Sequence, residues 1–563
     1  MRIISLVKFG GYGILFVMSK TYLVTSALPY ANGDIHLGHL VEHVQTDIFV
    51  RFQKLRGNKC FYMCADDAHG TAIMLSAEKE GVLPEAFIEK VKHQHVSDFE
   101  RFNIGYDHYY STHSDENREL SEFVYTSANT DGGIIKKDIQ QYFDEEKGLF
   151  LADRYIKGTC PKCGAEDQYG DACEKCYATY SATDLIDPVS VFSGKPPVLK
   201  DSTHYFFNLE KYRQHIIDWL DQNPVSQPVK NKLNEWLSGE LKPWDISRDA
   251  PYFGFKIPGT QDKYFYVWLD APIGYIATTE SWAKSNGESH ANYWKNDNVE
   301  IHHFIGKDIM YFHTLFWPAM LAVSGFNQPS KVHIHGFLTV NGEKMSKSRG
   351  TFILARDYAD KLDTDILRYY YAAKLSSSMD DIDFSLEDFV HRVNSDVLGK
   401  FINIASRIGS IVNKKLGARL STIDDEGLNL LNAIAKYSED VQVAYESLET
   451  NKCMRLIMEC AEMANKYIDD KAPWAMVKED EEAARVVCTV SLNALRMLNI
   501  YLSPVLPVIS SKLSAFLGIS PQSFNELMDW LINVDIQPYE HVLQRLKLED
   551  VSSLIAVPDN VTH

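Results

Sequence analysis

A strand–helix–strand pattern that begins near residue 20 and returns near residue 300 constrains the fold of this chain most. Residues 21–28 are rich in β-branched and aromatic side chains, and they stop at a turn-forming loop from Pro29 to Asp34. Apolar residues then recur at steps of three and four from Leu37 to Leu55, which predicts an amphipathic helix, and Cys60 to Cys64 is a second short apolar run. Because doubly wound parallel sheets are built from such units, we predict an α/β fold of Rossmann-like type.

The same pattern continues far along the chain. We predict a strand at Ile301 to Ile305, a helix at Met310 to Val323 and a strand at Lys331 to Leu338. The sheet is therefore expected to be split by an insertion. After about residue 395 the sequence changes to long helical patterns with few glycines, ending in a tail from about residue 540 that folds back. This region predicts an all-α helical bundle.

The length of 563 residues exceeds the roughly 250 to 300 residues that a single core supports, so several domains are expected. We divide the chain into an N-terminal extension (1–18), the two halves of the α/β domain (19–130 and 246–340), a connective insertion (131–245), a lysine-bearing loop region (341–395) and the helical bundle (396–563). Residues 1–18 superficially resemble a signal peptide, but glycines interrupt the apolar stretch. We interpret them as a start assigned too early, with Met18 as the expected first residue.

Composition limits the class of protein. The formal net charge of −19 argues against diffuse binding to nucleic acid, although it leaves room for a local basic face on one domain. Four of the nine cysteines crowd between Cys160 and Cys176, which is not the spacing of a secreted disulfide framework. No segment approaches the roughly 20 apolar residues of a membrane span. We therefore predict a cytoplasmic protein that does not enter a membrane.

The segment His36-Leu37-Gly38-His39 lies at the predicted strand-to-helix junction, where backbone N–H groups favour anions. Two imidazoles can donate hydrogen bonds to a triphosphate, and Gly38 lets a nucleotide approach the backbone. Taken alone, the match is better explained by histidines that cap a helix.

A second segment, Lys344-Met345-Ser346-Lys347-Ser348, lies in a loop flanked by glycines. Lys344 and Lys347 can clamp a pyrophosphate leaving group, whereas the alternative is a solvated basic turn. The occurrence of both segments, in this order, on a split nucleotide-binding sheet favours one ATP site that adenylates a substrate. A dinucleotide oxidoreductase would need a G-x-G-x-x-G turn, which the first strand lacks.

The cysteine cluster is a separate signal. Cys160, Cys163, Cys173 and Cys176 form two C-x-x-C pairs, and two such pairs complete the tetrahedron that Zn²⁺ prefers. We predict one structural zinc ion, with redox pairs or free thiols as the alternative. A zinc ribbon could also belong to a DNA- or RNA-binding module, but such a module predicts no adenylation chemistry.

With these segments the chain resembles the class I aminoacyl-tRNA synthetases, and within that class the methionyl-tRNA synthetase family. The resemblance runs from about Ser19 to beyond Trp474. It is nearly unbroken in four stretches: Ala27 to Gly33, Ala65 to Gly70, Val267 to Tyr275 and His303 to Asp308. It implies a ligase that activates methionine with ATP and Mg²⁺ and then loads tRNA(Met), including the initiator tRNA.

The resemblance also implies roles for individual residues. His36, His39, Lys344 and Lys347 would be catalytic. ATP would be bound by Tyr30, His36, Gly38, His39, Gly306, Asp308, Lys344 and Lys347. Methionine would be held by Leu28, Asp67, Trp268, Pro272, Tyr275, Ile309, Phe312 and His313. A carboxylate such as Asp67 suits an ammonium ion, and apolar and aromatic walls suit a thioether, although each aromatic could also be ordinary core.

In the helical region the resemblance implies that Asn403, Arg407 and Trp474 read the anticodon. Aromatic, amide and guanidinium side chains are apt for unstacked bases, although each alone is more often a core or surface residue. Longer family members append a C-terminal module, and on that comparison we predict a monomer.

Overall fold

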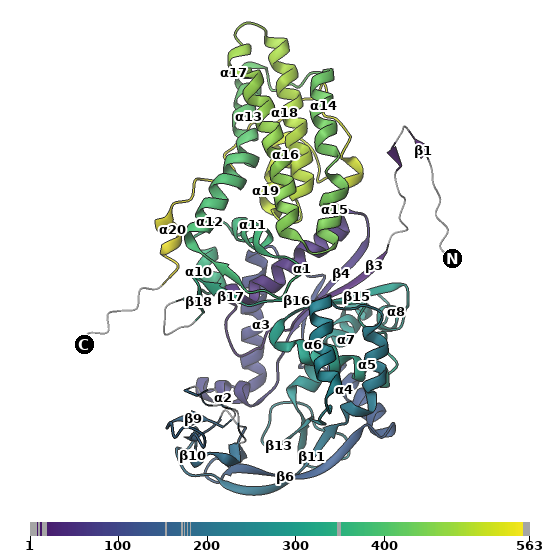
Figure 1. Cartoon of the computed structure of the whole chain (residues 1–563), viewed down its shortest axis with the longest axis vertical. Helices are drawn as coiled ribbons and strands as arrows, with labels where there is room; N and C mark the ends of the chain where they lie inside the picture. Colours follow the sequence, from purple (N-terminus) through teal and green to yellow (C-terminus); the bar gives the residue numbers. More distant parts are fainter. Residues whose placement is uncertain are drawn as a thin grey trace, which may run out of the picture.

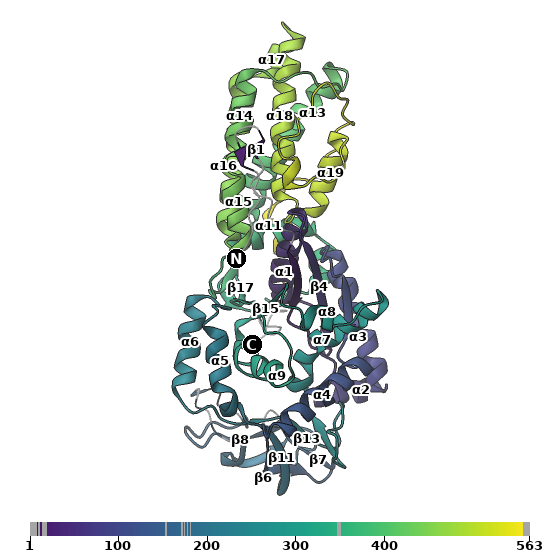
Figure 2. The same ribbon diagram turned by 90° about the vertical axis from the view of Figure 1, so that its right-hand side faces the viewer.

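The computed structural model describes residues 8–9, 12–13, 20–152, 155–170, 173, 175–176, 178, 180, 182–345 and 351–555. The predicted N-terminal extension lies mostly outside these residues. Its described pairs, β1 (Lys8–Phe9) and β2 (Tyr12–Gly13), form an antiparallel hairpin. The molecule is elongated, with a helical bundle at one end, a parallel sheet in the middle and an antiparallel insertion at the other end (Figures 1 and 2).

A five-stranded parallel sheet forms the centre, in the order β16-β15-β3-β4-β5. The strand order reverses between β3 and β15, and the loops that leave two such strands diverge, which forms a crevice at their carboxyl ends. The predicted α/β fold with a split parallel sheet is confirmed. Its strands are β3 (Thr21–Ser26), β4 (Lys59–Asp66), β5 (His108–Ser111), β15 (Val299–Gly306) and β16 (Lys331–His335).

Helices cover both faces of this sheet because successive strand side chains point to opposite sides. Tyr22 and Val24 pack with the helix α1, whereas Leu23 packs with α7 on the other face. The helix α1 has the predicted bounds. The helices of this domain are α1 (Leu37–Leu55), α2 (Thr71–Glu80), α3 (Pro84–Arg101), α4 (Asp115–Thr130), α7 (Val267–Ser285), α8 (Ala291–Trp294) and α9 (Trp317–Val323).

Two predicted elements near residue 320 are wrong in detail. The helix expected at Met310 to Val323 contains a π-helical segment, Phe312–Phe316, before α9 begins. The strand expected at Lys331 to Leu338 ends at His335, and the chain then enters a different sheet. That sheet has the order β18-β17-β19 and consists of β17 (Leu338–Val340), β18 (Glu343–Lys344) and β19 (Ile382–Phe384).

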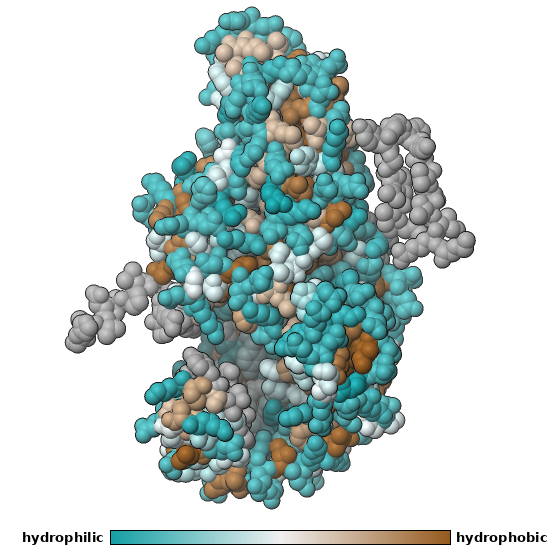
Figure 3. Space-filling view, viewed as in Figure 1, coloured by the Kyte–Doolittle hydropathy of each residue, from teal (hydrophilic) through white to brown (hydrophobic). Residues whose placement is uncertain are grey.

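The insertion leaves the sheet after α4 and is built of antiparallel strands. Its lobe with the cysteine cluster is a small sheet of order β10-β8-β9, and the surface is hollowed between this lobe and the body of the molecule (Figure 3). The strands of the insertion are β6 (Ile134–Asp144), β7 (Leu149–Phe150), β8 (Ile156–Thr159), β9 (Gln168–Tyr169), β10 (Ile186–Ser190), β11 (Val198–Phe207) and β12 (Trp244–Asp245); its helices are α5 (Arg213–Leu220) and α6 (Gln227–Ser238). Just beyond it, β13 (Ser247–Asp249) and β14 (Lys263–Phe265) form a separate antiparallel pair.

The helical bundle follows α10 (Ala355–Ala359), α11 (Thr364–Lys374), α12 (Leu386–Arg392) and a π-helix at Val393–Ile402. Its helices are α13 (Asn403–Lys415), α14 (Asp425–Ala435), α15 (Ser438–Glu446), α16 (Thr450–Lys471), α17 (Pro473–Met476), α18 (Glu481–Leu502) and α19 (Pro507–Leu517). The tail folds back as predicted, since Asn394 exchanges two hydrogen bonds with the backbone of Leu546 and α20 (Leu548–Ser552) lies beside α12. None of the helices in the described ranges combines the length and apolar character needed to cross a bilayer.

A buried arginine joins the bundle to the sheet domain. Arg368 of α11 is completely buried, and its guanidinium donates at 2.6 Å to Asp47 of α1. It also donates to the backbone oxygens of Val505 and Pro504, in the turn before α19, at 2.9 Å each. The helix α1, which begins at the predicted ATP site, is thereby fixed against both domains.

Candidate active site

The structure brings the two signature segments together at the crevice. His36 forms an isolated antiparallel bridge with Leu354, just beyond the lysine loop. The backbone N–H of Leu37 donates to Ile353 O at 3.1 Å, and the N–H of Ala355 donates to Ile35 O at 2.9 Å. Segments more than 300 residues apart in sequence are thus held side by side at the carboxyl end of β3.

The two signature histidines cap α1. His36 Nδ1 accepts the N–H of Gly38 at 3.0 Å, and His39 Nδ1 accepts the N–H of His36 at 3.3 Å. The two rings stack with centroids 3.8 Å apart. Burial is the main cause that lowers the pKa of His39 well below its usual value, and the nearby His36 lowers it further. The imidazole of His39 is therefore neutral. Because Nδ1 accepts, a neutral ring carries its proton on Nε2.

Glycine is required between these histidines because of a close approach. A Cβ added to Gly38 would lie 2.6 Å from Cε of Met345 and 2.8 Å from the His36 ring. Met345 belongs to the lysine loop, so the loop reaches the start of α1. Lys344 is exposed on β18, and its carbonyl accepts the hydroxyl of Thr351 at 3.1 Å. Lys347 lies outside the described residues.

The other residues predicted to bind ATP lie around the same crevice. Tyr30 follows β3, is 37% exposed and forms a parallel bridge with Asp67 at the end of β4. Gly306 ends β15, and a Cβ there would lie 2.5 Å from the carboxylate of Asp308, which is exposed. Residues predicted to bind ATP therefore follow both β3 and β15, the two strands between which the strand order reverses.

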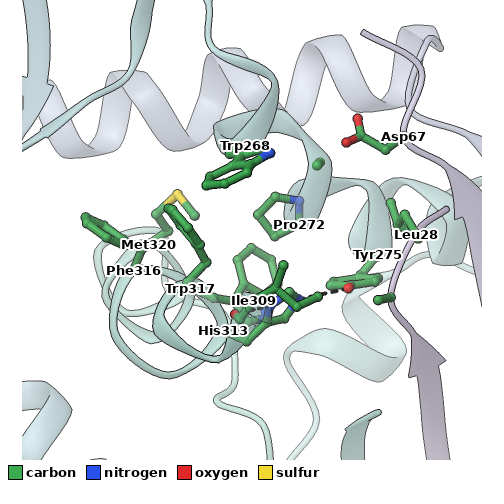
Figure 4. Close-up of a pocket in the computed structure, with 13 residues that line it drawn as sticks. Leu28, Asp67, Trp268, Pro272, Tyr275, Ile309, His313, Phe316, Trp317 and Met320 are labelled. Atoms are coloured by element: carbon green, nitrogen blue, oxygen red, sulfur yellow. Dashed lines mark hydrogen bonds between the residues drawn. The ribbon is translucent and has the colours of Figure 1, made fainter. Parts of the chain in front are cut away.

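A pocket opens beside this crevice, and all eight predicted methionine-binding residues line it (Figure 4). Asp67 lies on the strand side, whereas Phe316 and Met320 lie at the opposite end. The sequence analysis missed five lining residues: Ala27, Ala271, Phe316, Trp317 and Met320. Phe312, Phe316 and Met320 are four residues apart, so helical spacing was a signal for two of them.

Polar atoms at the floor of the pocket are fixed by hydrogen bonds. His313 Nδ1 lies 3.1 Å from the carbonyl oxygen of Ile309, which can only accept, so Nδ1 carries the proton. Nε2 then accepts the hydroxyl of Tyr275 at 2.9 Å. Burial lowers the pKa of His313 to about 4, so the ring is neutral and this arrangement has a single tautomer.

Asp67 supplies an acceptor for a cation. Its side chain is 8% exposed, and Oδ1 has no hydrogen-bond partner. Burial raises the pKa of this carboxyl well above its usual value, and the neighbouring Asp270 and Asp66 raise it further. An ammonium group bound here would supply the missing partner and stabilise the ionised form.

The four predicted zinc ligands converge in the insertion. Their Sγ atoms lie within 4.8 Å of one another, with Cys160 to Cys176 at 3.8 Å and Cys163 to Cys173 at 3.6 Å. Zn–S bonds of about 2.3 Å give tetrahedral S···S edges of about 3.8 Å. The N–H of Cys176 donates to Cys173 Sγ at 3.3 Å, which suits a thiolate. The cluster fits a tetrahedral zinc ion.

Two of the three predicted anticodon residues, Arg407 of α13 and Trp474 of α17, are in contact, and α17 lies at the end of the bundle far from the sheet (Figure 1). The guanidinium of Arg407 lies 4.7 Å from the ring centre of Trp474, which is 43% exposed. Arg407 also donates to Asp469 at 2.5 Å, and Asn403 donates to Asn465 at 3.2 Å. The arrangement presents an aromatic ring with adjacent hydrogen-bonding groups.

Comparison with known proteins agrees with this architecture. The family described as tRNA synthetases class I (M) matches residues 22–409, and the anticodon binding domain of methionyl tRNA ligase matches residues 420–537. A methionine–tRNA ligase of Psychrobacter sp. (strain PRwf-1) is 52% identical over 556 residues, covering 95% of this chain and 80% of that protein. One from Thiobacillus denitrificans is 52% identical over 543 residues, covering 96% and 78%.

A solved structure extends the similarity to three dimensions. The Mycobacterium tuberculosis methionyl-tRNA synthetase in complex with methionyl-adenylate superposes with a TM-score of 0.78 at 26% identity, covering 93% of this chain and 99% of that one. Both domain matches and the relatives span the crevice, the insertion and the bundle. The chain therefore belongs to the methionyl-tRNA synthetase family, the methionine–tRNA ligases.

Proposed function

We propose that methionine is activated in the crevice between β3 and β15 and that the residues around it divide the work. The observation that carries this assignment is the convergence of both signature segments beside a pocket with an unpartnered carboxylate oxygen on Asp67. Methionine would place its ammonium group at Asp67 and its thioether among Trp268, Pro272 and Phe312. A flexible, polarisable side chain suits such walls.

We assign ATP to the start of α1. The protonated Nε2 atoms of His36 and His39 would donate to phosphate oxygens beside the positive end of the helix. Gly38 and Gly306 would allow the nucleotide to approach the backbone, and Asp308 would accept the ribose hydroxyls. Lys344 and Lys347 would clamp the pyrophosphate, and Tyr30 would close the side of the site.

The chemistry then needs no side-chain nucleophile. The methionine carboxylate attacks the α-phosphorus of ATP, a P–O bond forms, and the bond to the departing pyrophosphate breaks. A hydroxyl of the 3′-terminal adenosine of tRNA(Met) next attacks the carbonyl carbon of the adenylate, and AMP leaves. Mg²⁺ accompanying ATP would neutralise part of the phosphate charge. The chain's own residues orient the reactants and stabilise the leaving group.

We assign a structural role to the cysteine cluster and an anticodon-binding role to the tip of the bundle. Cys160, Cys163, Cys173 and Cys176 would hold one zinc ion that fixes the β8–β10 lobe. Trp474, Arg407 and Asn403 would contact the unstacked bases of the anticodon of tRNA(Met), including the initiator tRNA.

We also propose the domain boundaries given above, because α4 ends at Thr130 and β12 ends at Asp245, next to the predicted limits of the insertion at 131 and 245. The monomeric state and the cytoplasmic location stay predictions. Light scattering of the purified chain and cell fractionation test them.

The decisive experiment is ATP–pyrophosphate exchange with each amino acid in turn. We expect exchange with methionine at low concentration, because the pocket is apolar and carries one acceptor for the ammonium group. Homocysteine, which lacks only one methyl, is expected to exchange more weakly, since a missing methylene in an apolar pocket discriminates by only about 1–3 kcal/mol. Exchange with leucine or cysteine but not methionine would contradict the assignment.

A further inference from the structure

A buried histidine outside the predicted site connects its two halves. His95 lies on α3, and its side chain is completely buried. Its Nδ1 lies 2.7 Å from Oδ1 of Asp66, the last residue of β4, and its Nε2 lies 2.6 Å from the carbonyl oxygen of Gly33. One imidazole thus spans the strand end that precedes Asp67 and the loop that precedes His36.

Both contacts require a proton on the ring. A carbonyl oxygen and a carboxylate oxygen that already receives the hydroxyl of Tyr109 at 2.5 Å can only accept, so both nitrogens of His95 donate. The ring is therefore an imidazolium. Burial lowers the pKa of His95, but the hydrogen bond and the charge of Asp66, the contact with the Gly33 carbonyl and the charge of Asp98 together outweigh burial, and the pKa is raised. Asp98 of α3 favours the charge, whereas His39 and His43 of α1, both with depressed pKa values, face the same region.

The loop that His95 contacts is also anchored by residues of α3 and α10. Asp34, one residue after Gly33, accepts the side-chain amide of Gln94 at 2.7 Å and a hydrogen bond from Arg356 of α10. The loop begins at Tyr30 and ends at His36, so α3 fixes the segment that presents both residues to the crevice. A change in this anchor would move the proposed ATP ligands without touching them.

The contact between His95 and Asp66 affects the ionisation of the neighbouring Asp67. Asp66 and Asp67 are adjacent and both buried, and Asp66 is one of the charges that raise the pKa of Asp67. Two like charges so close cannot both ionise cheaply unless one is neutralised. The imidazolium of His95 supplies that neutralisation through a charge-assisted hydrogen bond.

We propose that His95 is a positioning residue that holds the loop from Tyr30 to His36 in place for ATP and neutralises Asp66, so that Asp67 ionises and binds the substrate ammonium group. This inference rests on the proposed roles of Asp67 and of the β3–α1 loop. It adds a charged residue on α3 to the machinery of activation, through contacts to other residues and not to the substrates.

The experiment compares His95→Gln, Asp66→Asn and the double variant by ATP–pyrophosphate exchange, with KM measured separately for methionine and ATP. The Gln amide carries its donors on one nitrogen and cannot span both partners. We expect KM to rise about tenfold for each substrate in His95→Gln, the effect of losing a hydrogen bond to a charged group. His93→Gln is the matched control, because the His93 side chain lies two residues away on α3 and is 78% exposed.

The double variant separates positioning from a general structural defect. Removing the carboxylate of Asp66 abolishes the need for a compensating charge, so Asp66→Asn should restore the methionine KM of His95→Gln toward the wild-type value. The ATP KM should stay high, because the contact to Gly33 is still lost. A loss of thermal stability alone would show no such split between the two substrates.

Four outcomes are distinguished. Unchanged KM values in folded His95→Gln overturn the inference, and so does a double variant whose methionine KM is no better than that of the single variant. If the wild-type protein itself shows no methionine-dependent exchange, the proposed function fails instead, and these variants say nothing in its favour. Recovery of the methionine KM with a persistent ATP defect supports the inference.

Discussion

Two equally exposed tryptophans at opposite ends of the molecule allow the division of labour to be tested. Trp474 at the tip of the bundle is 43% exposed, and Trp268 at the methionine pocket is 42% exposed. Neither is needed to fill the core, so replacement by alanine should leave the fold intact. We expect Trp474→Ala to impair tRNA charging without affecting methionine activation, and Trp268→Ala to impair both.

The size of the effect expected for Trp474→Ala on the KM for tRNA follows from the contacts of this side chain. Base–aromatic stacking is worth about 1–3 kcal/mol per base, so its loss should raise the KM for tRNA about 5- to 150-fold. The contact with Arg407 at 4.7 Å is exposed and contributes about 0.5–1 kcal/mol to the local structure, too little to unfold the bundle. Because α17 lies at the end of the bundle away from the sheet (Figure 1), exchange should stay within error of the wild type.

The effect expected for Trp268→Ala is on the KM for methionine. Its ring packs edge-on against Phe312 with centroids 4.3 Å apart and forms one wall of the pocket. Removing this wall exposes the thioether to water, and the loss of about 2 kcal/mol of apolar contact should raise the KM for methionine more than tenfold. Exchange and charging should fall together, because both need the adenylate.

The assays are ATP–pyrophosphate exchange without tRNA and charging of tRNA(Met) transcript over a range of tRNA concentrations. Trp474→Phe serves as a control that keeps an aromatic ring and should retain most of the charging activity. The reasoning is refuted if Trp474→Ala reduces exchange as much as charging, or if it leaves charging unchanged. In the first case the bundle would act on activation itself, and in the second the anticodon would be read elsewhere.

Three further predictions follow from buried or crowded positions. Protein purified without chelator should contain one zinc ion per chain by elemental analysis, and Cys163→Ser should lower this content and expose the β8–β10 lobe to protease; finding no zinc in the wild type would contradict the assignment. Arg368→Met should lower the free energy of unfolding by about 3–5 kcal/mol, because the carboxylate of Asp47 stays buried without the guanidinium of Arg368. Thermal unfolding measures this loss. Burial raises the pKa of Asp47, but Arg368 and Arg51 outweigh it and the folded pKa is depressed, so this stabilisation is present above the ordinary carboxyl pKa and is lost as pH falls below it. Gly38→Ala should reduce exchange with little loss of stability, since its Cβ would lie 2.8 Å from the His36 ring and displace it; normal exchange would show that the position of this ring is not needed for ATP.

Local patterns were enough to predict the central sheet and α1. The step pattern from Leu37 to Leu55 and the run of β-branched and aromatic residues in β3 arise from residues that are neighbours in the chain, and they hold whatever the rest of the protein does. Each C-x-x-C pair likewise lies within four consecutive residues. These features were confirmed without knowledge of any distant contact.

The errors arose where distant contacts decide the structure. The strand after Lys331 ends because Gly336 packs directly against the backbone of Asp380, a close approach that no neighbouring residue signals. The π-helical turn at Phe312–Phe316 inserts a residue that a period of 3.6 does not reveal, and it rotates His313 toward Tyr275. Arg368 was equally invisible, because a sequence marks an arginine as exposed until its partners are known.

The first signature raised two interpretations, a helix cap and a phosphate clamp, and the structure makes them compatible. Capping occupies Nδ1 of His36 and His39, and a neutral ring then carries its proton on Nε2. Serine or aspartate caps a helix equally well, but serine has no second nitrogen and aspartate would repel a phosphate. The use of imidazole at both positions therefore favours an anion as the ligand, and the cap is part of how the chain presents its donors.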